Sequence, residues 1–243
     1  MRHLATLASA LVLAGCSGQH STSPASPPTA AVRAVCRPTF LVDGQEFKAG
    51  TAFVVEAPSG GAPLVVTALH LFGPDGGLSF QIPPTALLAR ARLVRCERLD
   101  GGGVVPGGPA VGLAGTAPYQ EGGTLRDLAA FRPATSSGAS APALRLAAND
   151  PVVGDPVWMV TQVANRSPNQ VLHRSTVEQT GPDALQYRFD DAAIDLKATS
   201  GAPVVNAAGE LVGINLVSYE DKTELAGGGD TLAITRQVLA QAH

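Results

Sequence analysis

Short apolar runs rich in valine, leucine and isoleucine recur from about residue 49 to the C-terminus, and glycine- and proline-rich segments separate them. Runs bounded in this way are typical of β-strands. In residues 185–190 apolar and polar side chains alternate, as a strand with one buried face requires. The pattern predicts strands over residues 51–56, 64–67, 93–97, 128–131, 156–163, 171–179, 185–190, 203–206, 211–218 and 231–235.

Turn-forming segments divide these strands into two groups. Residues 57–63 (APSGGAP) predict a hairpin turn, and the stretch 101–123, rich in glycine and proline, separates the strands on either side of it. Residues 135–142 (TSSGASAP) predict a connector, and only residues 236–242 favour a helix. The fold is therefore predicted to be all-β in two halves, which suits closed barrels or a sandwich.

The N-terminus has a different pattern from the rest of the chain. Residues 4–14 are apolar or small apart from two hydroxyl residues, and as a helix they would span roughly 16 Å, about half of a bilayer core. A secretory signal therefore fits better than a membrane-spanning helix. Residues 18–31 are rich in serine, threonine, proline and alanine, which predicts an extended tether.

Composition and charge exclude several classes of protein. The 243 residues carry a net charge of −3, and 45% of them are apolar, so global disorder is excluded and one large or two small domains are expected. With 17 Lys and Arg against 20 Asp and Glu, there is no basic excess for binding nucleic acid. Only 15% of residues are charged, which favours strands over long amphipathic helices.

The cysteines indicate an oxidised protein. An export signal would place the chain in an oxidising compartment, and two of its three cysteines, Cys36 and Cys96, lie in the predicted domain. This even pair suggests a disulfide, with two buried thiols as the alternative. No cysteine has the spacing of a metal site, so no metal and no cofactor are expected.

Three residues could carry chemistry. His70 stands where a buried strand ends in a turn, and an imidazole with an unperturbed pKa of about 6.5 is a natural proton shuttle. Ser200 lies in a turn with small neighbours, Gly201 among them, which we expect to leave room for a substrate carbonyl. Asp127 precedes an apolar strand and could orient an imidazole. His173 lies in mid-strand and is predicted to be structural.

Residues 13–16 (LAGC) resemble the lipobox of bacterial lipoproteins. The resemblance implies cleavage before Cys16 and acylation of that residue, and several acyl chains would give a stable membrane anchor. Ser17 follows, rather than the aspartate that implies retention at the inner membrane, so an outer-membrane location facing the periplasm or the cell surface is expected. The alternative is an ordinary secretory signal with a chance cysteine.

Three segments resemble the motifs of the trypsin/chymotrypsin-like serine proteases, with the bacterial, glutamyl-endopeptidase-like branch nearest. They are TALH ending at His70, DLA beginning at Asp127, and TSGAPV containing Ser200. An α/β-hydrolase would have the reverse order and a G-x-S-x-G motif. The resemblance covers roughly residue 49 to the C-terminus. It implies two six-stranded antiparallel β-barrels, at about 35–134 and 143–243 after a tether at 16–34, and a short C-terminal helix.

The family resemblance implies a His-Asp-Ser triad of His70, Asp127 and Ser200, with His70 taking the Ser200 proton and Asp127 orienting the ring. It also implies an oxyanion hole made of the backbone N–H groups of Ala198 and Ser200. Ala198 stands where the family usually has glycine, so its methyl group is expected to strain the backbone or to flip the peptide. Thr199 replaces the aspartate with which a freed N-terminus pairs in the animal enzymes.

The resemblance further implies substrate contacts at Ile194, Leu216 and Ser218. Ile194 stands where trypsin has an aspartate, so a preference for arginine or lysine is not expected. We therefore expect a monomeric, exported, lipid-anchored serine endopeptidase that acts on polypeptides. Two alternatives remain: a catalytically silent protease-fold lipoprotein that binds envelope partners, and a β-sandwich adhesin or carbohydrate module.

Overall fold

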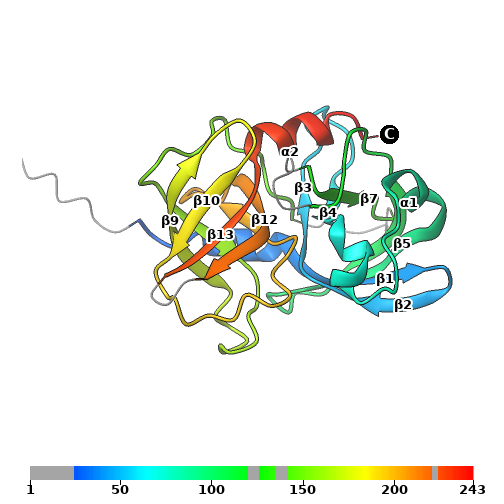
Figure 1. Ribbon diagram of the computed structural model, residues 1–243, viewed down its shortest axis with the longest axis horizontal. Helices are drawn as coiled ribbons and strands as arrows, with labels where there is room; N and C mark the ends of the chain where they lie inside the picture. The colour runs from blue at the N-terminus through cyan, green and yellow to red at the C-terminus, as the bar shows by residue number, and fades with distance from the viewer. Residues whose placement is uncertain (1–24, 120–125, 135–141, 221–223, 243) are drawn as a thin grey trace, which may run out of the picture.

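The computed structural model describes residues 25–119, 126–134, 142–220 and 224–242, which form two β-barrels and a C-terminal helix (Figure 1). The predicted signal peptide, Cys16, most of the predicted tether and nearly all of the predicted connector at 135–142 lie outside these residues. Among the described residues, none of the helices has the length and apolar character needed to cross a membrane.

The first barrel is closed by six antiparallel strands in the order β1-β3-β4-β7-β6-β5, because β1 pairs with both β3 and β5. A seventh strand, β2, pairs with the outer part of β1. The core of the first barrel includes the packed rings of Phe40, Phe72 and Phe131. The strands are β1 (Val35–Val42), β2 (Gln45–Lys48), β3 (Ala52–Val55), β4 (Leu64–Ala68), β5 (Ala91–Arg98), β6 (Val104–Val111) and β7 (Leu128–Phe131).

The second barrel is closed in the order β10-β13-β12-β11-β8-β9. Its strands are β8 (Pro156–Val160), β9 (Leu172–Thr180), β10 (Leu185–Phe189), β11 (Pro203–Val205), β12 (Leu211–Glu220) and β13 (Leu225–Thr231). All pairings between the named strands are antiparallel, so the predicted architecture is confirmed and the β-sandwich alternative is wrong.

An apolar cluster joins the two barrels. It combines Val66 and Leu128 of the first barrel with Trp158 and Ile214 of the second, and the C-terminal helix α2 (Leu232–Leu239) adds Ile234 to it. In Figure 1, α2 (red) runs from the second barrel towards the first. Burial of this cluster fixes how the barrels sit against each other, and residues at their junction therefore have defined positions.

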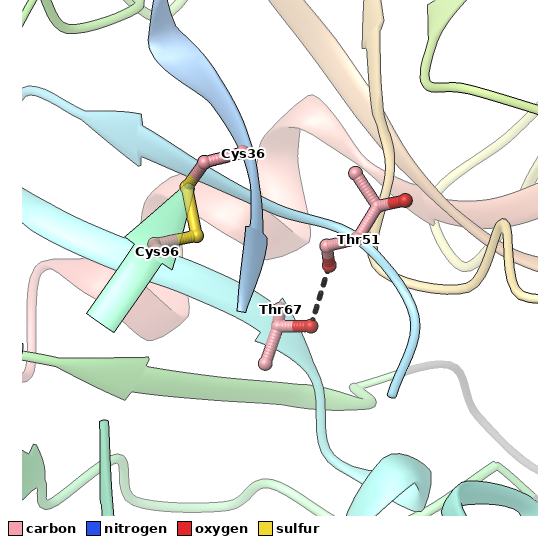
Figure 2. The surroundings of a disulfide bond; sticks show 4 residues. All are labelled: Cys36, Thr51, Thr67 and Cys96. Carbon is pink, nitrogen blue, oxygen red and sulfur yellow. Dashed lines mark hydrogen bonds between the residues drawn. A yellow bond between two sulfur atoms is a disulfide. The ribbon is translucent and has the colours of Figure 1, made fainter. Parts of the chain in front are cut away.

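A disulfide joins Cys36 of β1 to Cys96 of β5, the two strands that close the first barrel (Figure 2). Both cysteines are fully buried, and their Cα atoms are 5.4 Å apart. The predicted pairing is confirmed, and the alternative of two free thiols is wrong. The disulfide therefore adds a covalent link between the two strands whose pairing closes the barrel.

Several predicted elements need correction. The strand predicted at 231–235 is wrong, because β13 ends at Thr231, whose hydroxyl accepts a hydrogen bond from the Ile234 amide and begins α2. The sequence pattern also missed β1, β2, β6, nearly all of β13 and the short helix α1 (Pro84–Arg90). β6 lies inside the stretch predicted as a separator. There Gly108 lets two strands approach, since a Cβ at this position would lie 1.7 Å from the Arg132 carbonyl oxygen.

The predicted tether is too long at its C-terminal end. Thr29–Ala34 form the 3-10 helix η1, in which Ala31 and Ala34 are buried against the junction of the barrels. The folded part of the chain therefore begins before residue 35. The alanine side chain is only a methyl group, so it marks a segment as apolar only weakly in the sequence, although it packs well in a tight space.

Candidate active site

Strand pairing brings His70 and Asp127 together. β4 pairs with β7, with Ala68 opposite Leu128, so the residues just beyond these positions are neighbours. The His70 backbone N–H donates a hydrogen bond to Asp127 Oδ1 at 2.8 Å, and His70 Nδ1 lies 2.5 Å from Asp127 Oδ2. The Leu69 amide also donates to the Asp127 carbonyl oxygen, at 3.2 Å. Three hydrogen bonds thus hold the imidazole and the carboxylate in one orientation.

This hydrogen bonding determines which imidazole nitrogen can act as a base. Asp127 is fully buried and His70 is only 7% exposed. An ionised carboxylate can only accept hydrogen bonds, so Nδ1 carries a hydrogen and Nε2 of the neutral ring has an available lone pair. The arrangement supplies a proton acceptor on the side of the ring away from Asp127.

Ser200 lies on a turn that is attached to the first barrel. The Ser200 carbonyl oxygen accepts a hydrogen bond from the Thr51 amide at 2.9 Å. The Thr51 carbonyl in turn accepts one from Thr67 Oγ1 at 2.7 Å, as Figure 2 shows. Thr67 is on β4, which leads to His70. The turn with Ser200 therefore packs against the strand ends that carry the imidazole.

Gly201 makes this contact between the barrels possible. Its φ is +81°, and a Cβ there would lie 2.4 Å from the Thr51 carbonyl oxygen and 2.5 Å from Thr67 Oγ1. The prediction that this small residue leaves room for substrate needs correction, because the first barrel occupies the space. Because Gly201 has no side chain, the two barrels can approach closely here, and this contact fixes the position of the neighbouring Ser200.

The Ser200 hydroxyl does not hydrogen-bond to the His70 ring within the described residues. Its Oγ donates to the Leu216 carbonyl oxygen at 3.5 Å, which is a long contact. Catalytic hydrogen bonds are often long without substrate. The structure thus joins two of the three predicted residues directly, and it places the third on an adjoining turn.

Ala198 has a left-handed backbone, with φ of +60°. Only glycine adopts this region without a steric cost, so the strain expected from the methyl group is present. No acceptor among the described residues binds the Ala198 or the Ser200 amide, whereas the Thr199 amide between them donates to the Leu196 carbonyl at 3.3 Å. The oxyanion hole that these two amides would form stays a prediction.

The residues predicted to contact substrate occupy different environments. Ile194 is buried in the core of the second barrel, with 5% of its surface exposed. Leu216 is also buried, but its carbonyl oxygen faces Ser200. Ser218 is exposed on β12, opposite Gly227 of β13. Their contacts with substrate remain predictions.

A buried polar network below Ser200 was not predicted. The Tyr187 hydroxyl donates to Asn215 Oδ1 at 2.5 Å, and Asn215 Nδ2 donates to Thr199 Oγ1 at 3.1 Å. Burial raises the pKa of Tyr187, so its hydroxyl keeps its proton and remains a donor. The network holds the residue just before Ser200. Its signal in the sequence is Asn215 itself, a single amide within the apolar run at 211–216.

His173 is structural, as predicted. It is buried, and its Nε2 lies 3.0 Å from the Thr161 carbonyl oxygen. Burial lowers its pKa, so the neutral ring donates this hydrogen bond at neutral pH. Among the described residues, no group of histidine, cysteine and carboxylate side chains could hold a metal ion.

Comparisons with known proteins agree with this fold. In solved structures, the fold is similar to the active form of the Rv3671c protease from M. tuberculosis, with a TM-score of 0.55, 16% identity and 96% of each chain covered. The inactive form of that protease has a TM-score of 0.50 and 15% identity, and the match covers 88% of this chain and 90% of the other. No curated protein sequence matches. The trypsin-like peptidase domain matches residues 50–214, which is most of the folded part. The chain therefore belongs to the family of trypsin-like peptidase domains.

Proposed function

We propose that this peptidase is a serine endopeptidase whose triad is His70, Asp127 and Ser200. The observation that carries the proposal is the buried, doubly hydrogen-bonded His70–Asp127 pair beside the turn that presents Ser200. A serine hydroxyl is a weak nucleophile until a base removes its proton, and His70 Nε2 is the base that this pair prepares.

The reaction proceeds in two halves. Ser200 Oγ forms a bond to the carbonyl carbon of the substrate while its proton passes to His70 Nε2, and the carbonyl electron pair moves to the oxygen. The intermediate collapses, the C–N bond breaks, and the leaving amine takes the proton from His70. Water then repeats the sequence on the acyl-enzyme, with His70 again as the base. The amides of Ala198 and Ser200 would stabilise the oxyanion, a contribution of about 10²–10³ in rate per donor.

Labelling with a fluorophosphonate tests the nucleophile. The wild type and the Ser167→Ala variant, which removes an exposed hydroxyl between β8 and β9, should be labelled. The Ser200→Ala variant should not be labelled. Labelling of all three proteins would show that Ser200 is not the reactive serine.

A second function has specific support. The Ser200 hydroxyl contacts the Leu216 carbonyl rather than His70, and Ala198 is strained, so the same fold could serve as a silent binding module. In that case a folded wild-type sample would not be labelled at all. Circular dichroism on the same sample separates this result from failure to fold.

The substrate class follows from the family and needs its own test. We propose a polypeptide substrate and a relation to the glutamyl-endopeptidase-like branch. Profiling with a peptide library, including acidic and basic residues before the cleaved bond, measures the preference. Enrichment of acidic residues would support this branch, and enrichment of arginine or lysine would contradict it.

We also propose that the chain is exported and anchored by lipid at Cys16, at the outer membrane, and that it is monomeric. The support for export and for the lipid anchor is the segment at 13–16. The Cys16→Ala variant should lose incorporation of labelled fatty acid and should leave the membrane fraction. An ordinary secretory signal would give an unlabelled wild type that is already soluble.

A further inference from the structure

Asp230 is a buried carboxyl group that the proposed reaction does not use. It lies near the end of β13, opposite Ile214 of β12, and it is fully buried. Neither of its carboxyl oxygens has a hydrogen-bond partner among the described residues. A charged carboxylate without donors is strongly destabilised inside a protein, so this site favours the protonated acid.

Asp230 lies near the catalytic pair at the junction of the barrels. Leu128, which follows Asp127, packs in the same apolar cluster as Ile214, which pairs with Asp230, and Ile234 of α2. The charged groups that act on Asp230 are Asp127, which disfavours its ionisation, and Arg126, which favours it. The backbone of Asp127 lies close enough to favour the ionised form as well. Burial outweighs all of these and raises the pKa of Asp230 to about 8.

The hydrogen bonds show which of the two carboxyl groups holds the charge. Asp127 receives two hydrogen bonds from His70, one from the backbone and one from the ring, whereas Asp230 receives none from the described residues. Hydrogen bonds donated to a carboxyl group favour its ionised form, whereas burial without donors favours the protonated form. The proton therefore stays on Asp230 while Asp127 is the carboxylate that orients the imidazole.

We propose that protonated Asp230 is a positioning residue for the His70–Asp127 pair, and that its ionisation at alkaline pH disables this pair. The proposal rests on the proposed function and adds its regulation by pH. Ionisation would place a second negative charge near Asp127, where burial and the Asp127 charge disfavour it more than the Asp127 backbone favours it. Water entry or displacement of the Asp127 segment relieves that repulsion, and either change disturbs the imidazole.

The first test is the pH dependence of kcat and KM for the mature chain. The Asp230→Asn variant copies the neutral acid in size, and Asp183→Asn, in the exposed turn between β9 and β10, is its matched control. At about pH 6 all three proteins should have kcat within about threefold. Above about pH 8 the kcat of the wild type and the control should fall by up to tenfold per pH unit, while that of Asp230→Asn stays level. If kcat falls equally in all three proteins above about pH 8, the proposal is overturned.

The second test does not depend on activity. The folded chain keeps the Asp230 proton up to about pH 8, whereas the unfolded chain loses it above a pKa of 3.8. The wild type should therefore become less stable relative to Asp230→Asn as pH rises between these values, by up to tenfold per pH unit in the unfolding constant. Parallel stability curves would overturn the proposal. A wild type with the expected stability curve but no peptidase activity at any pH would instead overturn the proposed function, together with the catalytic role of Asp230.

Discussion

The substitution Gly201→Ala tests how the two barrels form one site. Gly201 combines a left-handed backbone, with φ of +81°, and a close approach to the Thr51 carbonyl oxygen. Gly209, in the turn between β11 and β12, has nearly the same φ of +79°, but a Cβ there would meet nothing closer than 3.7 Å. The two glycines therefore differ mainly in the contact between the barrels.

The expected magnitudes follow from this difference. An alanine forced into the left-handed region costs about 1–2 kcal/mol at either position. Replacing glycine by alanine also lowers the conformational entropy of the unfolded chain, and this stabilising effect is the same in both variants. Only at Gly201 does the new methyl group overlap backbone atoms, which adds about 1–3 kcal/mol. We therefore expect Gly201→Ala to lower the free energy of unfolding by about 2–5 kcal/mol and Gly209→Ala by about 1–2 kcal/mol.

Urea unfolding of both variants measures stability, and hydrolysis of a peptide substrate measures activity. Because the overlap displaces the turn that carries Ser200, Gly201→Ala should also lower kcat/KM about 100-fold, while Gly209→Ala leaves it nearly unchanged. Equal losses of stability in the two variants, or full activity in Gly201→Ala, would refute the role of this contact.

The remaining predictions concern the strained residue, the disulfide and the carboxylate. Ala198→Gly should remove the strain of the positive φ and stabilise the chain by about 0.5–1 kcal/mol in urea unfolding, and a loss of stability would contradict the strain argument. Replacing both Cys36 and Cys96 by alanine opens a loop with a sequence separation of 60, which should cost about 4 kcal/mol; an unchanged urea midpoint would show that strand pairing alone closes the barrel. Asp127→Asn keeps the size of the side chain but favours the wrong tautomer of His70, so kcat should fall about 10⁴-fold while folding, followed by circular dichroism, is retained.

Much of the second barrel could be predicted because most of its strands carry regular apolar patterns, although the glycine-rich β13 does not. Residues 185–190 alternate, and residues 211–218 form one apolar run with a turn before it. The first barrel was harder, since β6 contains two glycines and two prolines that suggest a loop, and β2 is largely exposed. Such strands are held by backbone pairing with neighbours that are distant in sequence, which a local pattern does not report.

The candidate site shows the same division. The order of three motifs was enough to select His70 and Asp127, which the structure places in direct contact. Asp230 and the Tyr187–Asn215 pair could not be selected, because their importance arises from burial and from partners brought near by folding. In sequence, Asp230 is only an acidic residue after three glycines.

The disulfide has a consequence for how this molecule responds to its surroundings. It lies in the barrel that supplies the imidazole and its carboxylate, whereas the barrel that supplies the hydroxyl contains no cysteine. Thiol reductants therefore weaken the barrel that contains His70 and Asp127 and leave the barrel that contains Ser200 covalently unaltered. If the proposed triad is correct, oxidation stabilises the barrel with the base directly and the barrel with the nucleophile only through their shared interface.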